Sequence, residues 1–303
     1  MYYEVIVVDD GSIDNTADIA NRFNVTYIYQ ANQGPAAARN KGAQTAQGEI
    51  ILFTDSDCVP DHNWIKEMVR LFDNSGVVGV KGSYKTNQNE LAARFAQAEF
   101  EDRYDLLQKS QTIDMVDTYS AAFRKDIFLG MKGFDENFPV ANNEDTDLSY
   151  RLVAAGYTLL FNSKAFVYHI HPDTFMQYLR VKFWRGYWRM IVYRRFPDKA
   201  VKDSYTPAVI KIQTLFMALS FPLFFLSWFS TGLLYAGLLL WIGIMASSFS
   251  FSLKTYKKNK IVGLISPLVI LFRSLVFAMG SLSGMIVSYS KKNSKKICEK
   301  VDC

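Results

Sequence analysis

The sequence predicts an α/β domain that is followed by membrane helices. Short β-branched segments alternate with helical stretches over residues 1–172, which is typical of a doubly wound sheet. Residues 212–253 then form a run of 42 residues without a charged side chain. The net charge also changes along the chain, from −10 over residues 1–173 (15 basic against 25 acidic) to +9 over residues 206–303 (11 against 2). An acidic α/β domain therefore precedes a basic, apolar membrane region.

The composition excludes several classes of protein. With 303 residues, of which 50% are hydrophobic and 21% charged, the chain is neither disordered, nor collagen-like, nor a small disulfide-rich protein. The three cysteines, Cys58, Cys298 and Cys303, lack zinc-ligand spacing, so we expect a reduced domain that faces the cytosol. No cleavable signal peptide is expected, because the first apolar patch runs directly into Asp9 and Asp10.

In the α/β domain we expect strands at 4–8, 26–29, 49–54 and 77–81, with helices after the first three. This alternation predicts a mostly parallel sheet sandwiched by helices. Ligands bind such sheets at the carboxyl ends of the strands, and two acidic clusters fall at strand ends.

The first cluster contains Asp9 and Asp10, and the second contains Asp55 and Asp57. Two carboxylates that leave an apolar strand together at positions i and i+2 suit Mg²⁺ or Mn²⁺, which can bridge to a diphosphate. The alternatives are a helix cap with solvated acids for the first cluster and a chance surface loop for the second. Between the clusters, residues 32–42 predict a turn and a helix of small residues that leaves Arg39 available to a phosphate or a base.

A third polar cluster comprises residues 133–136 and 142–152. Asn143 is expected to cap a helix that Gly156 ends, which places Glu144 and Asp145 in the first turn. The helix dipole favours acids at that position in any case, so a purely structural role is the alternative.

Residues 173–205 are expected to form interfacial helices. Arg and Lys alternate with Phe, Trp and Tyr over residues 175–196, a pattern that suits a membrane surface. Nucleic-acid binding also uses basic and aromatic residues, but the neighbouring apolar segments argue against it, and we expect no nucleic-acid partner.

The membrane region, residues 206–303, is expected to contain two transmembrane helices at about 212–229 and 233–253, joined by a tight turn. Buried helices of a soluble core are the alternative. A third apolar segment, 261–290, is long enough to span but contains Pro267 and Arg273.

The topology of this third segment follows from its charges. A full crossing would place four lysines outside, against the positive-inside rule, and a central arginine costs about 2.5 to 3.5 kcal/mol on insertion scales. We therefore favour an interfacial or re-entrant segment over a third span. The lysines are Lys291, Lys292, Lys295 and Lys296.

Taken in order, the motifs resemble those of the nucleotide-sugar-dependent glycosyltransferases of family 2. The resemblance covers residues 4–172, and the C-terminal part is similar to members that are membrane-bound and build exopolysaccharides or lipid-linked glycans. It implies a GT-A fold and an inverting transferase that uses a divalent metal. The motifs are DDGS, NQGPAAARNKG, DSD, GFDE and NEDTDLSYRL.

The resemblance also implies roles for individual residues. Asp9 and Asp10 would contact the nucleoside of the donor, and Arg39 would contact the donor as well. Asp55 would contact the ribose and the metal, and Asp57 would hold Mg²⁺ or Mn²⁺ on the diphosphate. The remaining two assignments lie in the third cluster: Asp145 would be the catalytic base, and Glu144 would position the acceptor.

Direct displacement at an anomeric carbon needs a base for the acceptor hydroxyl and a counter-charge for the leaving nucleoside diphosphate. His169 and His171 alternate on an expected strand, which could bring one of them, taken here as His171, to the metal; a core or surface histidine is the alternative. The expected partners are a nucleotide-sugar donor, a lipid-linked or glycan acceptor and membrane lipids. The expected location is the cell membrane, with a multi-pass anchor and a cytoplasmic catalytic domain.

One departure from the family pattern leads to a second hypothesis. Members usually begin with a further strand that carries a Pro-x-x-Asn-like turn, whereas here Met1 lies eight residues before Asp9. We therefore expect that strand to be absent. The alternative function is a truncated, non-catalytic membrane subunit that binds a nucleotide sugar. The motifs leave the identity of the sugar, nucleotide and acceptor open.

Overall fold

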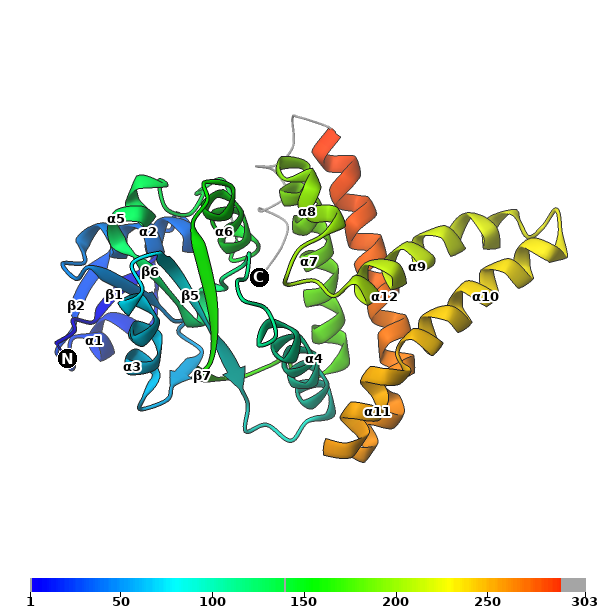
Figure 1. Ribbon diagram of the computed structural model, residues 1–303, viewed down its shortest axis with the longest axis horizontal. Helices are drawn as coiled ribbons and strands as arrows, with labels where there is room; N and C mark the ends of the chain where they lie inside the picture. Colours follow the sequence, from blue (N-terminus) through cyan, green and yellow to red (C-terminus); the bar gives the residue numbers. More distant parts are fainter. Residues whose placement is uncertain (1, 139, 290–303) are drawn as a thin grey trace. The chain divides into compact units, whose positions relative to one another are not determined.

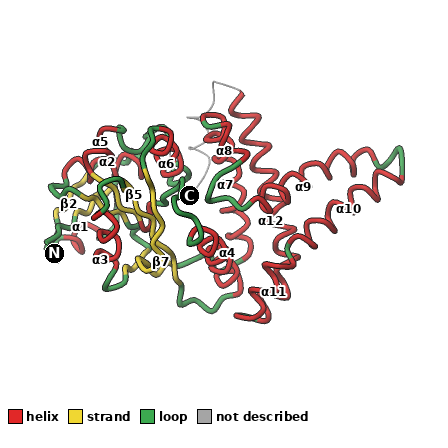
Figure 2. Tube along the Cα trace, viewed as in Figure 1, coloured by secondary structure: helices red, strands yellow, loops and turns green. Residues whose placement is uncertain are grey.

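A computed structural model describes residues 2–138 and 140–289 of the chain. It divides into two compact units (Figures 1 and 2). Unit 1 contains Met1–Tyr84 and Gln108–Tyr168, and unit 2 contains Lys85–Leu107 and His169–Cys303. The internal segment Lys85–Leu107 therefore groups with the C-terminal helices and not with the α/β part that surrounds it in the sequence.

Over the residues that the structure describes, unit 1 contains the strands and seven helices of at most 11 residues. Its strands are β1 (Ile6–Asp9), β2 (Thr26–Tyr29), β3 (Ile50–Phe53), β4 (Cys58–Pro60), β5 (Val77–Lys85), β6 (Ala121–Arg124) and β7 (Thr158–His169). Its helices are α1 (Thr16–Ala20), α2 (Pro35–Thr45), α3 (Trp64–Val69), η1 (Arg70–Asp73), η2 (Thr118–Ser120), α5 (Lys125–Gly130) and α6 (Glu144–Ala154).

The strands form two sheets instead of the single, mostly parallel sheet that we expected. Strands β1 and β2 pair in parallel as a two-stranded sheet, and a five-stranded sheet has the order β3-β6-β5-β7-β4. Strand β6 pairs antiparallel with both β3 and β5. The sequence pattern missed β6 because only four residues, Ala121–Arg124, form it, and this short segment begins with two alanines and lacks the alternation of a longer strand.

An aromatic core fixes the carboxyl end of β3. The ring of Phe53, the last residue of the strand, lies 5.4 Å from Phe134, 5.5 Å from Phe128 and 6.2 Å from Phe123, measured between ring centroids. Three of these aromatic side chains are at most 1% exposed: Phe123, Phe128 and Phe134. Burying such rings stabilises the fold by about 1.5 to 3 kcal/mol each, so the loop that begins at Thr54 leaves from a rigid point.

Unit 2 is helical. It contains α4 (Leu91–Leu107), α7 (Phe175–Arg195), α8 (Pro197–Val201), α9 (Ala208–Leu226), α10 (Thr231–Ser247), α11 (Phe249–Lys258) and α12 (Lys260–Tyr289). Helix α7 begins with a capping box, in which the Thr174 hydroxyl accepts from the Gln177 N–H and the Gln177 amide accepts from the Thr174 N–H. The helix therefore begins where the basic aromatic segment was expected.

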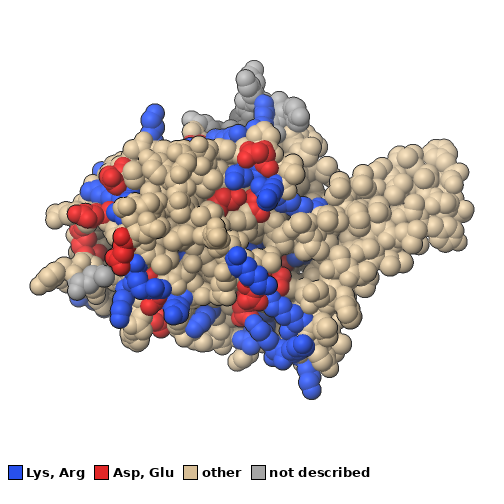
Figure 3. Space-filling model, in the orientation of Figure 1, with Lys and Arg blue, Asp and Glu red and all other residues tan. Residues whose placement is uncertain are grey.

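Among the residues that the structure describes, three helical segments are long and apolar enough to cross a membrane: Ala208–Leu226, Thr231–Lys258 and Lys260–Val287. The face of α9 and α10 that Figure 3 shows carries almost no charge. The second segment bends at Ser248, so α10 ends earlier than the expected boundary at 253. Helix α12 continues through Pro267 without a break, unlike a re-entrant loop. The four lysines that entered the topology argument lie outside the described residues.

Helices α7 and α12 pack closely along their backbones. A Cβ atom on Gly280 would collide with the carbonyl oxygen of Phe183, and one on Gly284 would collide with that of Tyr187. Glycine at both positions lets the two helices approach each other, as small residues do in membrane helix pairs. Gly280 and Gly284 therefore form the contact surface of α12 toward α7.

Candidate active site

Asp9 is the last residue of strand β1 and Asp10 follows it, and the two carboxylates have different hydrogen-bond partners. Asp9 Oδ1 accepts from the backbone N–H of Ser12 at 2.7 Å, and its Oδ2 accepts from the Tyr27 hydroxyl at 2.6 Å. The hydrogen bonds from Tyr27 and then Ser12 lower the pKa of the Asp9 carboxyl. Asp9 is therefore held as a carboxylate at the end of a parallel strand.

The side chain of Asp10 holds the turn that precedes α2. Its oxygens accept from Gln30 Nε2 at 2.7 Å and from the backbone N–H groups of Gln33 and Gly34, each at 2.8 Å. Three bonds to the protein occupy much of this carboxylate. This positioning role for Asp10 was missed in the sequence, because its partners lie 20 to 24 residues away.

Arg39 in α2 joins two of the acidic motifs. Its Nη2 lies 2.7 Å from Asp55 Oδ1, and its Nη1 lies 2.6 Å from Glu144 Oε1. The Arg39 side chain is 16% exposed. The guanidinium fork is planar and carries donors on both sides, so it can hold two carboxylates in fixed positions. Three residues that the sequence assigned to one site do meet in unit 1.

Glu144 is the most buried acid of this group. Its side chain is 2% exposed, and its Oε2 has no hydrogen-bond partner among the described residues. Burial and the neighbouring Asp145 carboxylate raise the pKa of Glu144 to about 7, although Arg39 acts in the opposite direction. A carboxyl group of this kind changes its charge near neutral pH.

Asp145 follows Glu144 in the first turn of α6. One of its oxygens, Oδ1, accepts from the backbone N–H of Thr146 at 2.7 Å. Asn143 precedes the helix as expected, but its backbone is left-handed, with φ of 70°, and its side chain does not cap the helix. The helix ends in a Schellman motif at Gly156, with bonds from Gly156 N to Val153 O and from Tyr157 N to Leu152 O.

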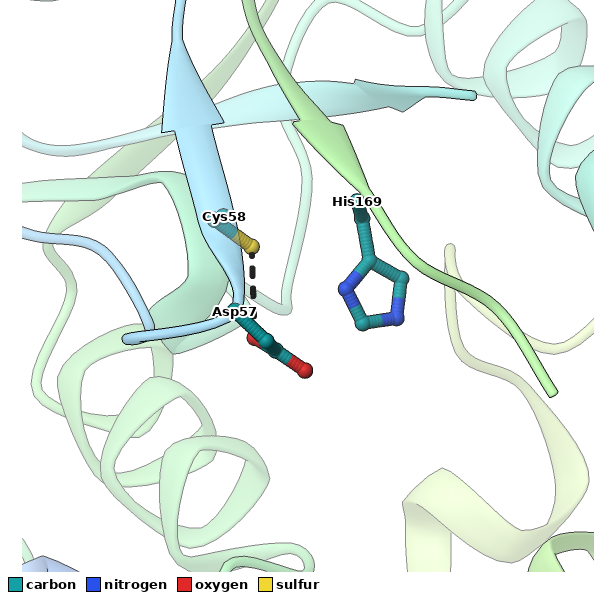
Figure 4. Close-up of side chains that lie close together, drawn as sticks. All are labelled: Asp57, Cys58 and His169. Carbon is teal, nitrogen blue, oxygen red and sulfur yellow. Dashed lines mark hydrogen bonds between the residues drawn. The ribbon is translucent and has the colours of Figure 1, made fainter. Parts of the chain in front are cut away.

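Asp57 is exposed and lies directly before β4. The thiol of Cys58 donates to Asp57 Oδ1 at 3.6 Å (Figure 4). Burial, followed by the charge of Asp57, raises the pKa of Cys58 to about 12, so the thiol stays protonated. Asp55 and Asp57 supply carboxylate oxygens, which are the ligands that Mg²⁺ and Mn²⁺ prefer. One oxygen of Asp55 already contacts Arg39.

The two histidines do not lie on one strand, although the sequence predicted this. Strand β7 ends at His169 (Figure 4), and His171 lies beyond it in the following loop. The His171 ring is buried against α4, where it stacks on Phe100 at 5.6 Å and its Nε2 lies 2.9 Å from Gln97 Oε1. His171 is thus a core histidine of unit 2, and this alternative interpretation of the pair fits its surroundings better than a metal ligand.

Asn40 was not recognised in the sequence, although it follows Arg39 directly. Its amide donates to the carbonyl oxygen of Phe134 at 2.9 Å and accepts from the Phe134 N–H at 2.9 Å. A second bond runs from Asn40 Nδ2 to Glu136 at 2.9 Å. Asn40 is 5% exposed, so it docks the 133–136 loop onto α2 from inside the fold. The motif Asn-Lys-Gly, which begins with Asn40, gave no indication of this role.

These positions describe an acidic site beside one buried arginine. Asp55, Glu144 and Asp145 contribute negative charge, and Arg39 offers a cation that lies between two of them. Such a site can bind a cationic metal and a phosphate together, and it contains carboxylates that can accept a proton.

Comparisons with known proteins agree with the motifs. A family model described as "Glycosyl transferase family 2" matches residues 1–130. Glycosyltransferase AglE of Haloferax volcanii is 31% identical over 170 residues, which is 52% of this chain and 54% of that protein. Poly-beta-1,6-N-acetyl-D-glucosamine synthase of Staphylococcus aureus is 26% identical over 182 residues, which is 56% of this chain and 43% of that protein. The chain thus spans about half the length of these relatives.

A solved structure shows the same fold. The mannosyltransferase of Pyrobaculum calidifontis, determined in complex with GDP-Man and Mn²⁺, aligns with a TM-score of 0.56 at 15% sequence identity. The alignment covers 96% of this chain and 79% of that protein. The likeness confirms the GT-A fold that the motif resemblance implied, with a mixed sheet and C-terminal helices.

Proposed function

We propose that this chain, whose residues 1–130 match the glycosyl transferase family 2 model, transfers a sugar from a nucleotide donor to a lipid-linked or glycan acceptor. The transfer takes place at the cytoplasmic face of the membrane. The observation that carries the proposal is the position of Arg39 between Asp55 and Glu144, which come from three separate motifs.

In this proposal the donor binds at the carboxyl ends of β1 and β3. Asp9 contacts the nucleoside, and Asp10 keeps the turn before α2 in place to complete that contact. Arg39 faces the diphosphate, where a guanidinium is a strong partner for phosphate oxygens. Asp55 has a ribose contact in addition to its bond with Arg39.

Asp57 and Asp55 would hold a divalent cation, Mg²⁺ or Mn²⁺, beside the diphosphate of the donor. When bound, the cation supplies a counter-charge for the leaving group. The exposed carboxylate of Asp57 is accessible for this role, and His169, the last residue of the strand next to β4 in the sheet, is a more suitable third ligand than the buried His171. The Pyrobaculum mannosyltransferase was determined with Mn²⁺ bound, which agrees with such a cation.

Asp145 acts as the general base. The oxygen of the acceptor hydroxyl attacks the anomeric carbon while the bond to the nucleoside diphosphate breaks, and the hydroxyl proton passes to the Asp145 carboxylate. A single displacement inverts the anomeric configuration. Glu144 orients the acceptor from its buried position, and Arg39 holds the Glu144 side chain in one rotamer.

The helices of unit 2 anchor the enzyme. Helices α9 and α10 each have a length of about 25 to 30 Å, at 1.5 Å per residue, which matches the hydrocarbon core of a bilayer. They cross as a hairpin, and the lysines around residue 257 stay on the cytoplasmic side with the catalytic domain.

The test uses membranes that contain the full chain. A panel of nucleotide sugars is supplied with Mn²⁺ and native lipid, and release of nucleoside diphosphate is measured for the wild type, for Asp145→Asn and for Asp73→Asn, which removes an exposed acid elsewhere in unit 1. Release that needs the metal and is lost only in Asp145→Asn supports the proposal. Donor binding without release in the wild type would instead support a non-catalytic subunit.

A further inference from the structure

Unit 2 contains a buried cluster of charges that the sugar-transfer proposal does not use. Glu99 of α4 accepts from Tyr178 Oη at 2.7 Å, lies 2.7 Å from Lys182 Nζ and lies 2.6 Å from Arg273 Nη1. All four side chains are buried, since each residue is at most 7% exposed. A buried charge is costly unless it is paired, and here one carboxylate faces two cations.

A third cation adds to this imbalance. Arg103 lies one turn further along α4 and is 7% exposed. Its guanidinium carbon lies 4.1 Å from the centroid of the Tyr205 ring, so the ring covers one face. Among the residues that the structure describes, neither Nε nor Nη1 of Arg103 has a hydrogen-bond partner. Two unsatisfied donors on a buried cation point to a missing anionic partner.

Arg103 lines a pocket that lies wholly within unit 2. The pocket has about 400 Å³ of empty space, including the part that is open to its surroundings. Gln213, Ser247 and Arg273 add further polar groups to its wall, while Val209 and Phe251 add apolar surface. Asp102 also lines the pocket, but it is paired with Lys254 at 2.7 Å. The acids in the wall have cationic partners, whereas Arg103 offers two donors that no described residue accepts.

The pocket lies at the end of the α9–α10 hairpin, and residues of α4 complete its wall. Residues 207–213 begin α9, and residues 247–248 end α10, so the polar wall is at the level where two membrane helices enter and leave the bilayer. Phosphate headgroups occupy that level, and acyl chains lie beside the apolar helix surfaces.

We propose that this pocket binds the phosphate group of an anionic membrane lipid, with Arg103 as its principal donor. The lipid chain would lie along the apolar wall that Val209 and Phe251 contribute. Two lipids share this chemistry: a bulk anionic phospholipid and an isoprenoid monophosphate that carries or receives a sugar. The inference rests on the membrane placement of unit 2 and goes beyond sugar transfer.

The electrostatics of α7 support an anion site. Burial, followed by the charges of Arg185 and Arg103, lowers the pKa of Lys182 to about 7, and the opposing effect of Glu99 does not compensate. The guanidinium carbon of Arg185 lies 5.8 Å from the centroid of the Phe100 ring of α4. A bound phosphate would reduce this repulsion among cations.

The test measures lipid binding to the purified full chain in detergent by native mass spectrometry. The probes are undecaprenyl phosphate, phosphatidylglycerol and undecaprenol, the last being matched to the first except for its missing phosphate. The variant is Arg103→Gln, and the control is Arg180→Gln, which removes the same charge from a less buried position of α7. Thermal unfolding without added lipid identifies variants that fail to fold.

We expect at least one phosphate-bearing lipid to bind tenfold or more tightly than undecaprenol. Arg103→Gln should weaken that binding at least tenfold, while Arg180→Gln should change it less than twofold. Preference for undecaprenyl phosphate would assign the site to an acceptor-type lipid, and equal or better binding of phosphatidylglycerol would assign it to a bulk phospholipid.

Two outcomes would overturn the inference: equal binding of undecaprenol and both phosphate lipids, or an unchanged affinity in folded Arg103→Gln. If the glutamine variant does not fold, Arg103→Lys takes its place. Lysine keeps the charge but offers a single nitrogen, so at least threefold weaker binding is expected, and wild-type affinity would count against the site. None of these readouts depends on sugar transfer.

Discussion

Arg39 and Glu144 are 105 residues apart in the sequence, yet Arg39 Nη1 lies 2.6 Å from Glu144 Oε1. The same guanidinium contacts Asp55 at 2.7 Å. This pairing connects the start of α6 to the loop after β3, so the acids of two motifs have a fixed spacing before any ligand binds. Preorganised charges of this kind are what a transfer reaction requires.

The contacts of Arg39 with both carboxylates predict that Arg39→Lys will weaken donor binding. Lysine keeps the charge but cannot reach two carboxylates in the fixed planar geometry of a guanidinium. We expect about a tenfold to hundredfold loss of affinity for the nucleoside diphosphate, measured by calorimetry on the full chain. Arg22→Lys, at an exposed position of unit 1, serves as the control. Wild-type affinity in Arg39→Lys would show that the arginine serves the fold alone.

Glu144 predicts a dependence of stability on pH. Its pKa in the folded protein is raised to about 7 by burial first and by Asp145 second. The contribution of Glu144 to the free energy of unfolding is therefore fully present below its pKa in the unfolded chain, about 4.5. This contribution is lost as the pH rises through its pKa in the folded protein, about 7. The loss is on the order of 1 to 3 kcal/mol.

The measurement is thermal unfolding of the wild type and of Glu144→Gln between pH 5.5 and 8.5. The difference between the two melting temperatures removes the contributions of other groups, including Arg39, Asp55 and Asp145. We expect the wild type to lose stability relative to the variant as the pH rises. Parallel curves would mean that Glu144 does not titrate in this range.

Asp57 predicts a change in metal dependence. Replacing it by asparagine removes a charged oxygen ligand, so half-maximal activity should require at least tenfold more Mn²⁺. Asp126→Asn, an acid in the first turn of α5, should leave the requirement unchanged. A titration of activity against Mn²⁺ distinguishes the variants, and an identical midpoint in Asp57→Asn would remove this residue from the metal site.

The hydrogen bonds of Asn40 predict that its replacement by alanine will destabilise the fold. Asn40→Ala leaves the buried N–H and C=O groups of Phe134 without their partner, and each such group costs about 1 to 3 kcal/mol. The free energy of unfolding should fall by about 2 to 5 kcal/mol. Gln44→Ala, on the exposed side of the same helix, provides a matched control that should stay within about 0.5 kcal/mol. Equal stability of the two variants would contradict the docking role.

The close contact of α7 and α12 predicts a steric effect. Gly280→Ala places a methyl group against the carbonyl oxygen of Phe183, so the helices must separate, at a cost of about 1 to 3 kcal/mol. Gly232→Ala meets its nearest atom, Ser230 Oγ, at 3.5 Å and should be tolerated. Thermal unfolding in detergent compares the two. A neutral Gly280→Ala would indicate that the helices are not in contact in the membrane protein.

Local patterns in the sequence were sufficient for much of the fold. Asp9 ends β1, the acids at 10, 55 and 57 follow β1 or β3, and Glu144 and Asp145 do begin a helix, because strand ends and helix ends are marked by nearby residues. The uncharged run 212–253 likewise contains most of the α9–α10 hairpin. Long-range pairing was less predictable, and the antiparallel strand β6 was missed.

The sequence by itself determined the order of most elements, the resemblance of the motifs to a known family and the set of candidate residues, because these depend on residue types and local spacing. Only the tertiary structure decided which of them meet. Arg273 illustrates the reason: in the sequence it is a charge inside an apolar helix, and it argued against a membrane span. In the fold it lies 2.6 Å from Glu99, 174 residues earlier, and the energy of a buried charge depends on that partner.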